Sequence, residues 1–146
     1  MIHKKIMSTE STEKITVETI INKPVDLVWE YWTAPEHIQN WNNASDDWHT
    51  PHAKNDLRDG GDFIIRMESK DGTMGFDFGG TYDHVIIHET INYTMGDGRK
   101  VLVNFDGENN VTKITETFDP EKENPAEMQR AGWQAILDNF KKYCEK

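Results

Sequence analysis

The stretch MGFDFGGTYDHVIIHETINYTM, residues 74–95, decides the fold. Apolar and polar residues alternate in both halves, the two-residue period of strands that bury one face. The polar residues 88–90 interrupt the period, which predicts two antiparallel strands joined by a turn. The period places on one face Phe76, Phe78, Gly80, Tyr82, His84 and Ile86 of the first strand, and Ile91, Tyr93 and Met95 of the second.

The neighbouring segments extend this pair into a sheet. Upstream, DFIIRMES (62–69) alternates with Phe63, Ile65 and Met67 on one face, and Asp71–Gly72 is a two-residue turn signal. Downstream, KVLVNF (100–105) and VTKITETF (111–118) continue the pattern. With residues 14–21 and a short segment around 48–53, they predict a curved antiparallel sheet of about six or seven strands, mostly a meander.

Helical spacing appears in three places. PVDLVWEYW (24–32) has apolar residues at 25, 28, 29 and 32, and a second short helix is expected in APEHIQNW (34–41). From Pro125 to Tyr143 an apolar stripe predicts a long helix, with Asn124 as its N-cap. The fold class is therefore α+β: strand 1, two short helices, a sheet, and a long C-terminal helix over the sheet.

Composition restricts the class of protein. The 146 residues suit one domain, assigned to 14–146, with 1–13 expected as a disordered lead-in. The formal net charge of −10 disfavours nucleic acid, and no apolar run is long enough to predict membrane insertion. One cysteine, Cys144, allows no internal disulfide, which fits the cytoplasm.

The series INKPVDLVWEYWTAPEHIQNW, DLRDGGDFIIRM, DGTMGFDFGGTYDHV, INYTM and AGWQAILDNF resembles stand-alone relatives of the heat-shock-protein-90 ATPase activators. That family belongs to the START-like or SRPBCC superfamily, which has the helix-grip fold. The resemblance spans about Ile15 to Tyr143. It implies a deep cavity between sheet and C-terminal helix that binds a hydrophobic or amphipathic small molecule, and a stress-related role.

The candidate cavity residues are mostly aromatic or thioether side chains. Either they fill an ordinary core or they line a cavity, and Gly79–Gly80 and Gly132, which lack side-chain volume, fit a cavity or close backbone packing. Thioether chains suit an adaptable lining. We expect the ligand-binding residues to be Trp32, Trp41, Met67, Phe76, Phe78, Tyr82, His84, Tyr93, Glu116, Met128, Trp133 and Ile136.

Two of these residues could add polar chemistry. The period places His84 inward, as a structural histidine, a ligand contact or an acid–base group. It places Glu116 on the same face as Ile114 and Phe118, inside the cavity or at its rim. His49 and His52 with nearby aspartates are a weak metal pattern, so no metal and no cofactor are expected.

Three functions remain open. The first is non-catalytic binding of a hydrophobic or lipid-like molecule by a monomer or weak dimer. The second is a cyclase or hydrolase reaction in the same cavity, although no G-x-S-x-G or P-loop motif is present. The third is a chaperone-interaction module that uses an outer surface.

Overall fold

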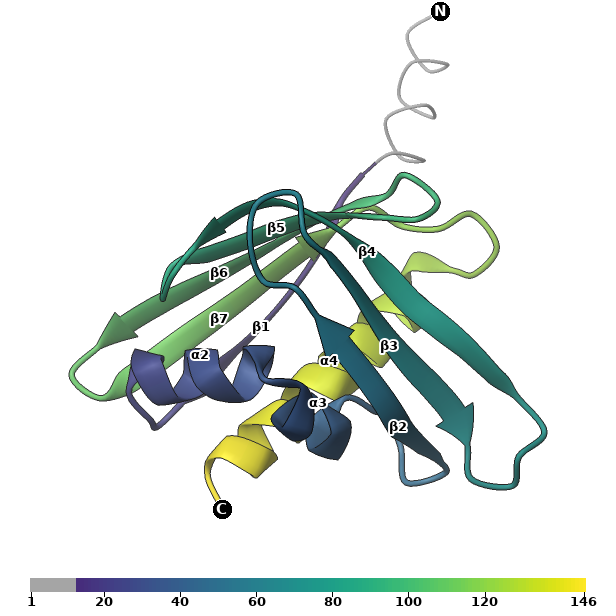
Figure 1. Cartoon of the computed structure of the whole chain (residues 1–146), viewed down its shortest axis with the longest axis horizontal. Helices are drawn as coiled ribbons and strands as arrows, with labels where there is room; N and C mark the ends of the chain where they lie inside the picture. Colours follow the sequence, from purple (N-terminus) through teal and green to yellow (C-terminus); the bar gives the residue numbers. More distant parts are fainter. Residues whose placement is uncertain (1–12) are drawn as a thin grey trace, which may run out of the picture.

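The computed structural model describes residues 13–146 as a curled sheet with helices inside the curl (Figure 1). The predicted lead-in over 1–13 lies, apart from Glu13, outside the described residues. Strand β1 (Ile15–Ile21) is followed by α2 (Val25–Thr33) and α3 (Pro35–Trp41). The rest are β2 (Trp48–Asn55), β3 (Asp62–Ser69), β4 (Gly75–Ile86), β5 (Thr90–Met95), β6 (Lys100–Glu108), β7 (Val111–Phe118) and α4 (Ala126–Cys144).

The sheet is antiparallel throughout, in the order β1-β7-β6-β5-β4-β3-β2. Strands β2 to β7 form a continuous meander, and β1 joins it beside β7, with Ile15 opposite Phe118. The predicted fold class is confirmed: two short helices follow the first strand, and a long helix ends the chain.

Strand β4 lies close to the backbone of both neighbouring strands at Gly79–Gly80. A methyl group on Gly80 would lie 2.4 Å from the carbonyl oxygen of Thr94, and one on Gly79 would lie 2.6 Å from that of Phe63. These contacts are too short for any side chain, so close backbone approach explains the pair. The two glycines thereby permit the local curl of the sheet.

A register shift in β4 reverses the inward face beyond Tyr82. Tyr82 pairs with Tyr93, but the next pairs are His84 with Asn92 and Val85 with Ile91, which leaves Asp83 as an extra residue. The prediction that His84 points inward is therefore wrong. Val85 takes the inward position, because a one-residue insertion moves each following side chain to the opposite face.

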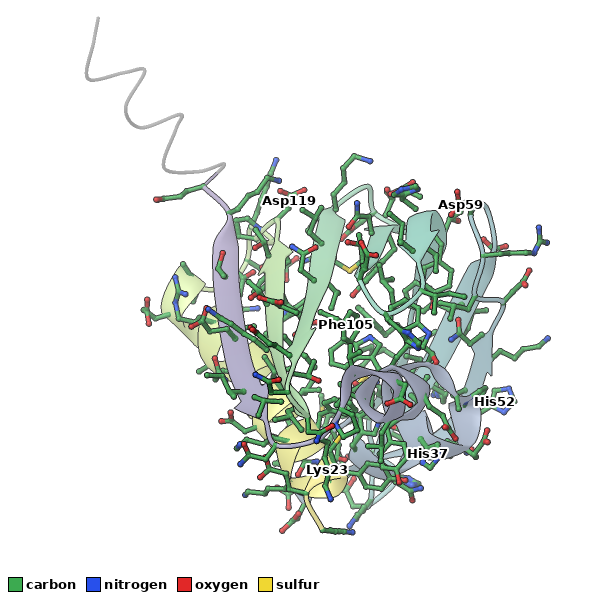
Figure 2. The ribbon with its side chains drawn as sticks, turned by 90° about the vertical axis from the view of Figure 1, so that its left-hand side faces the viewer. Lys23, His37, His52, Asp59, Phe105 and Asp119 are labelled. Atoms are coloured by element: carbon green, nitrogen blue, oxygen red, sulfur yellow. The ribbon has the colours of Figure 1, made fainter. Side chains whose placement is uncertain are left out.

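An aromatic cluster fills one end of the curl. Phe105 of β6 lies between the sheet and α2 (Figure 2), with its ring 5.0 Å from that of Trp29 and 5.7 Å from that of Trp32. Trp41 and Phe140 continue the cluster, with ring centroids 4.6 Å apart. This end of the concave face is consequently solid core.

Helix α4 is fixed along the edge strand β1. Arg130 Nη1 and Gln134 Nε2 donate hydrogen bonds to the carbonyl oxygens of Thr16 and Glu18, at 2.7 and 3.1 Å. Lys141 Nζ donates to the carbonyl of Ile20. These contacts satisfy the outer carbonyls of an edge strand. They also hold α4 near β1, so the helix does not pack closely on β3, β4 and β5.

The start of α4 differs from the prediction. The helix begins at Ala126 after Pro125, without a side-chain cap, so the assignment of Asn124 as N-cap is wrong. The Asn124 amide instead donates to the carboxylate of Glu121. Gln129 Nε2 donates to the carbonyl of Asn124 at 2.8 Å, which fixes the preceding loop against the first helical turn.

Candidate functional site

A cavity of about 390 Å³ lies between α4 and the concave face of the sheet. Its wall is built from β3, β4, β5 and β7, from α2, α3 and α4, from the turn between β5 and β6, and from the loop before α4. It includes every predicted site residue except His84, namely Trp32, Trp41, Met67, Phe76, Phe78, Tyr82, Tyr93, Glu116, Met128, Trp133 and Ile136.

Contacts between aromatic rings fix several side chains of the cavity wall. Trp133 of α4 stacks on Phe118 of β7, with ring centroids 3.9 Å apart and planes at 11°. Its ring meets Phe78 of β4 edge-to-face at 6.4 Å. Tyr93 packs edge-to-face on Phe63 at 4.9 Å. These contacts fix ring orientations, so the lining is a preformed apolar surface.

Gly132 leaves open space on the helix side. Met128, Gly132 and Ile136 are four residues apart, so they lie on one face of α4, and all three line the cavity. A methyl group on Gly132 would have no neighbouring atom within 4 Å. Gly132 therefore widens the cavity, unlike Gly79 and Gly80, which admit backbone.

The cavity has an apolar mouth. Phe76, near the start of β4, is 48% exposed, and Met128, in the first turns of α4, is 59% exposed. Both also line the cavity, so its opening lies between these two elements. An apolar molecule could pass from solvent to the interior between these side chains.

Glu116 places a carboxyl group in the cavity. It is only 7% exposed and pairs with Val17 on one side and Val103 on the other. No described residue forms a hydrogen bond or ion pair with its side chain, and burial raises its pKa to about 8. The inward placement predicted for Glu116 is confirmed, and the carboxyl group is mainly neutral at pH 7.

The two tyrosines of the wall differ in hydrogen bonding. The Tyr82 hydroxyl donates to Oδ1 of Asn55 at 2.5 Å, and Nδ2 of Asn55 donates to the carbonyl of Thr33 at 2.7 Å. The Tyr93 hydroxyl has no such partner among residues 13–146. Burial raises the pKa of Tyr93 well above its ordinary value, and the nearby Glu116 raises it further.

Polar residues gather at another part of the wall. Gln129 accepts a hydrogen bond from the backbone N–H of Glu121 at 2.9 Å and donates to that residue's carbonyl at 3.1 Å. Arg99 Nε donates to Asp97 Oδ2 at 2.8 Å. These bonds occupy the side-chain amide of Gln129 and the Nε–H of Arg99.

Sequence reasoning missed part of the lining. Phe63, Ile65, Ile91 and Met95 could have been found, because they share the strand faces of Met67 and Tyr93. The other missed residues lie on α3 and α4 or in loops, and no strand period marks them as cavity lining: Ile38, Asn42, Arg99, Glu121, Asn124 and Gln129.

No histidine of residues 13–146 lines the cavity. His84 is exposed, with Nδ1 3.6 Å from Oδ2 of Asp59, at the end of the sheet remote from α2 (Figure 2). His49 faces Glu68 at 3.9 Å, and His52 is exposed at the outer edge of the molecule (Figure 2). Within residues 13–146, no three His, Cys, Asp or Glu side chains are grouped to hold a metal ion. Glu116 thus has no histidine beside it in the described cavity wall.

Cys144 is structural in its surroundings. It is buried at the end of α4, and burial raises the pKa of its thiol to about 12.

Within residues 13–146, no helix combines the length and the apolar character needed to cross a membrane.

Comparison with known proteins shows the family of the chain. Residues 22–145 match the family model for Activator of Hsp90 ATPase homolog 1-like protein. The chain belongs to this family. The match covers α2 through α4, and so includes every element that lines the cavity. The predicted family resemblance is confirmed.

Solved structures agree with this assignment. An AHSA1-like protein from Aeromonas hydrophila is 45% identical, with a TM-score of 0.85, over 90% of this chain and 91% of that one. A protein from Cytophaga hutchinsonii is 52% identical, with a TM-score of 0.79, over 89% and 90% of the two chains.

More distant likeness concerns the fold alone. A protein from Nitrosomonas europaea is 19% identical, with a TM-score of 0.79, over 92% of this chain and 95% of that one. Among curated proteins, none matches this sequence.

Proposed function

We propose that this protein binds a hydrophobic or amphipathic small molecule in the cavity beneath α4. The observation that carries the proposal is the cavity of about 390 Å³, with aromatic and thioether walls and one unpartnered carboxyl group. Ligand sites in proteins are typically ~300–1,000 Å³, mostly apolar, with a few polar groups that orient the ligand.

The lining supports binding rather than incomplete packing. Trp133, Phe78 and Tyr93 are held by contacts with one another or with Phe118 and Phe63. Such a wall is rigid before the ligand arrives, which lowers the entropic cost of binding. Gly132 keeps the helix side open, although glycine inside a helix costs about 0.5–1 kcal/mol relative to alanine.

A thermal-shift screen tests the proposal. Fatty acids, sterols and polycyclic aromatic compounds would be added to the purified protein. A ligand that binds only the folded state raises the melting temperature in proportion to the logarithm of its concentration above Kd. We expect at least one apolar class to raise the melting temperature. An unchanged melting temperature with every compound would contradict the proposal.

Gly132 supplies the matched control. Gly132→Phe fills the space beneath α4, because nothing lies within 4 Å of the added Cβ, whereas Gly132→Ala adds one methyl group. Both variants should fold at least as stably as the wild type. We expect Gly132→Ala to retain the ligand shift and Gly132→Phe to lose it, and a shift of equal size in both would place binding outside the cavity.

A second candidate function rests on the family description, which names an activator of the Hsp90 ATPase. A chaperone partner would contact the outer surface of the protein. The test measures the ATPase rate of a bacterial Hsp90 homologue with and without this protein. Stimulation that persists in Gly132→Phe would assign this activity to a surface separate from the cavity, and no stimulation would remove this candidate.

A further inference from the structure

The side chains of Glu116 and Tyr93 have no hydrogen-bond partner among residues 13–146, and they come from neighbouring parts of the sheet. Tyr93 lies on β5 and Glu116 on β7, with β6 between them. Tyr93 pairs with Val101, which pairs with Phe118, and Glu116 pairs with Val103 one inward position further along. Both side chains therefore project from the same concave face, in adjacent cross-strand rows.

The oxygen atoms of both groups border open space. Among residues 13–146, the fully enclosed side-chain nitrogen and oxygen atoms without a partner belong to Asn42 and Asn92. The Glu116 carboxyl and Tyr93 hydroxyl also lack partners but are not enclosed in this way, although each residue is only 7% exposed. The space that both residues line is the cavity.

The carboxyl group of Glu116 also affects the pKa of Tyr93. Both side chains extend from one concave face into the same cavity, and after burial the charge of Glu116 is the next cause that raises the pKa of Tyr93. A neutral carboxyl group and a phenol each have one O–H donor. A pair of such donors, converging in an apolar site, is suited to one acceptor oxygen that can take two hydrogen bonds.

We propose that Glu116 and Tyr93 form a two-donor site for a carbonyl oxygen of an otherwise apolar, uncharged ligand. This inference rests on the proposed function, since it describes the polar contact of the same cavity. It names the ligand class: rigid or flexible hydrocarbon frameworks that carry a ketone, ester or similar carbonyl group.

The charge of the site favours this class over a cationic amine. The raised pKa of Glu116 keeps its carboxyl group mainly neutral at pH 7. The other titratable or charged groups in the wall are Tyr82, Arg99 and Glu121, and α4 adds none. The hydroxyl of Tyr82, the Nε–H of Arg99 and the carboxylate of Glu121 already have partners. An ammonium group would have to ionise a buried acid in a cavity that also contains Arg99.

Fluorenone and fluorene are a matched pair of probes for this site. They share a planar apolar framework, and only fluorenone carries a carbonyl oxygen. We expect both to bind, and the infrared C=O stretch of bound fluorenone to move to lower frequency than in an apolar solvent. Tyr93→Phe and Glu116→Leu should each reverse part of that shift.

Affinities for the two probes separate the polar contact from the cavity. Losing one neutral hydrogen bond should weaken fluorenone binding about fivefold in Tyr93→Phe and in Glu116→Leu. Fluorene affinity should stay the same or increase, which also shows that both variants fold. Glu116→Gln retains a donor, so it should bind fluorenone nearly as the wild type does.

The pH profile gives a second readout. Fluorenone affinity of the wild type should fall as the pH rises above about 8, where Glu116 loses its proton, and should stay level in Glu116→Gln. If both probes bind, but the variants weaken them equally and the C=O stretch does not move, the inference is overturned and the proposed function stands. If neither probe binds, the inference is overturned, and the thermal-shift screen decides the proposed function separately.

Discussion

At the scale of single residues, the cavity is distinguished by two polar side chains, Glu116 and Tyr93, that have no hydrogen-bond partner among the described residues. A buried carboxyl group normally has a hydrogen-bond partner or a counter-ion, and Glu116 has neither among the described residues. Its proton is therefore held more tightly in the folded chain than in the unfolded chain. Stability then depends on pH in a window where the other carboxyl groups are already ionised.

The first prediction concerns Glu116→Gln. Between about pH 4.5 and 8 the folded state retains a proton that the unfolded state has lost, so the free energy of unfolding decreases as the pH rises. The decrease should reach the order of a few kcal/mol and should be absent in the variant. Urea denaturation at pH 5, 6.5 and 8.5 measures it, and parallel profiles for the two proteins would contradict it.

The second prediction compares the two tyrosines. Tyr82→Phe leaves Oδ1 of Asn55 without its donor and should cost about 1–2 kcal/mol. Tyr93→Phe removes a hydroxyl that bonds no described residue, so it should change the free energy of unfolding by less than about 0.5 kcal/mol. Denaturant titrations of both variants provide the check. A cost for Tyr93→Phe equal to that of Tyr82→Phe would reveal a structural hydrogen bond.

Residue positions were predictable as far as the two-residue period held. Glu116 was placed correctly because β7 pairs without interruption from Val111 to Phe118. His84 was misplaced because one extra residue, Asp83, reverses the face of β4, and no turn residue marks that bulge. The lack of partners at Glu116 and Tyr93 depends on three-dimensional neighbours and could not be read from the chain.

At the scale of elements, β4 and α4 together determine the open space. In β4, Gly79 and Gly80 admit the backbone of the adjacent strands. Helix α4 is fixed to the opposite edge of the sheet, through Arg130, Gln134 and Lys141 on β1. Space remains between α4 and β4 because the contacts with β1 keep α4 from packing closely on β4.

The third prediction contrasts glycines in these two elements. Gly80→Ala forces a methyl group against the Thr94 carbonyl and should cost about 1–3 kcal/mol. Gly132→Ala places a methyl group in open space and improves helix propensity, so it should stabilise by about 0.5–1 kcal/mol. Urea midpoints that move in opposite directions would agree with this account, and a loss of stability in Gly132→Ala would contradict it.

At the scale of the whole molecule, the fold is a curled meander (Figure 1), with aromatic core at one end and the cavity at the other. The rings of Trp32, Trp41, Phe105 and Phe140 form this aromatic core. Alternation and helical spacing sufficed to predict the order of the elements. The size of the cavity was not predictable, because it depends on the position of α4 relative to β1.

The fourth prediction concerns ligand linkage in the folded protein. If the cavity holds an apolar ligand, saturation at one hundred times Kd should stabilise the protein by about 2.7 kcal/mol. Gly132→Phe should be more stable than the wild type without ligand and insensitive to ligand. Melting curves at several ligand concentrations test this, and a ligand-dependent shift in Gly132→Phe would disagree with it.

The most direct measurement is the set of intermolecular nuclear Overhauser effects between fluorenone and the methyl groups of the protein. The account predicts contacts with cavity methyls, namely those of Ile65, Met67, Ile91, Met95 and Ile136. Contacts confined to exposed outer residues, such as Ile20, Ile64, Met74, Ile87 and Leu102, would contradict it.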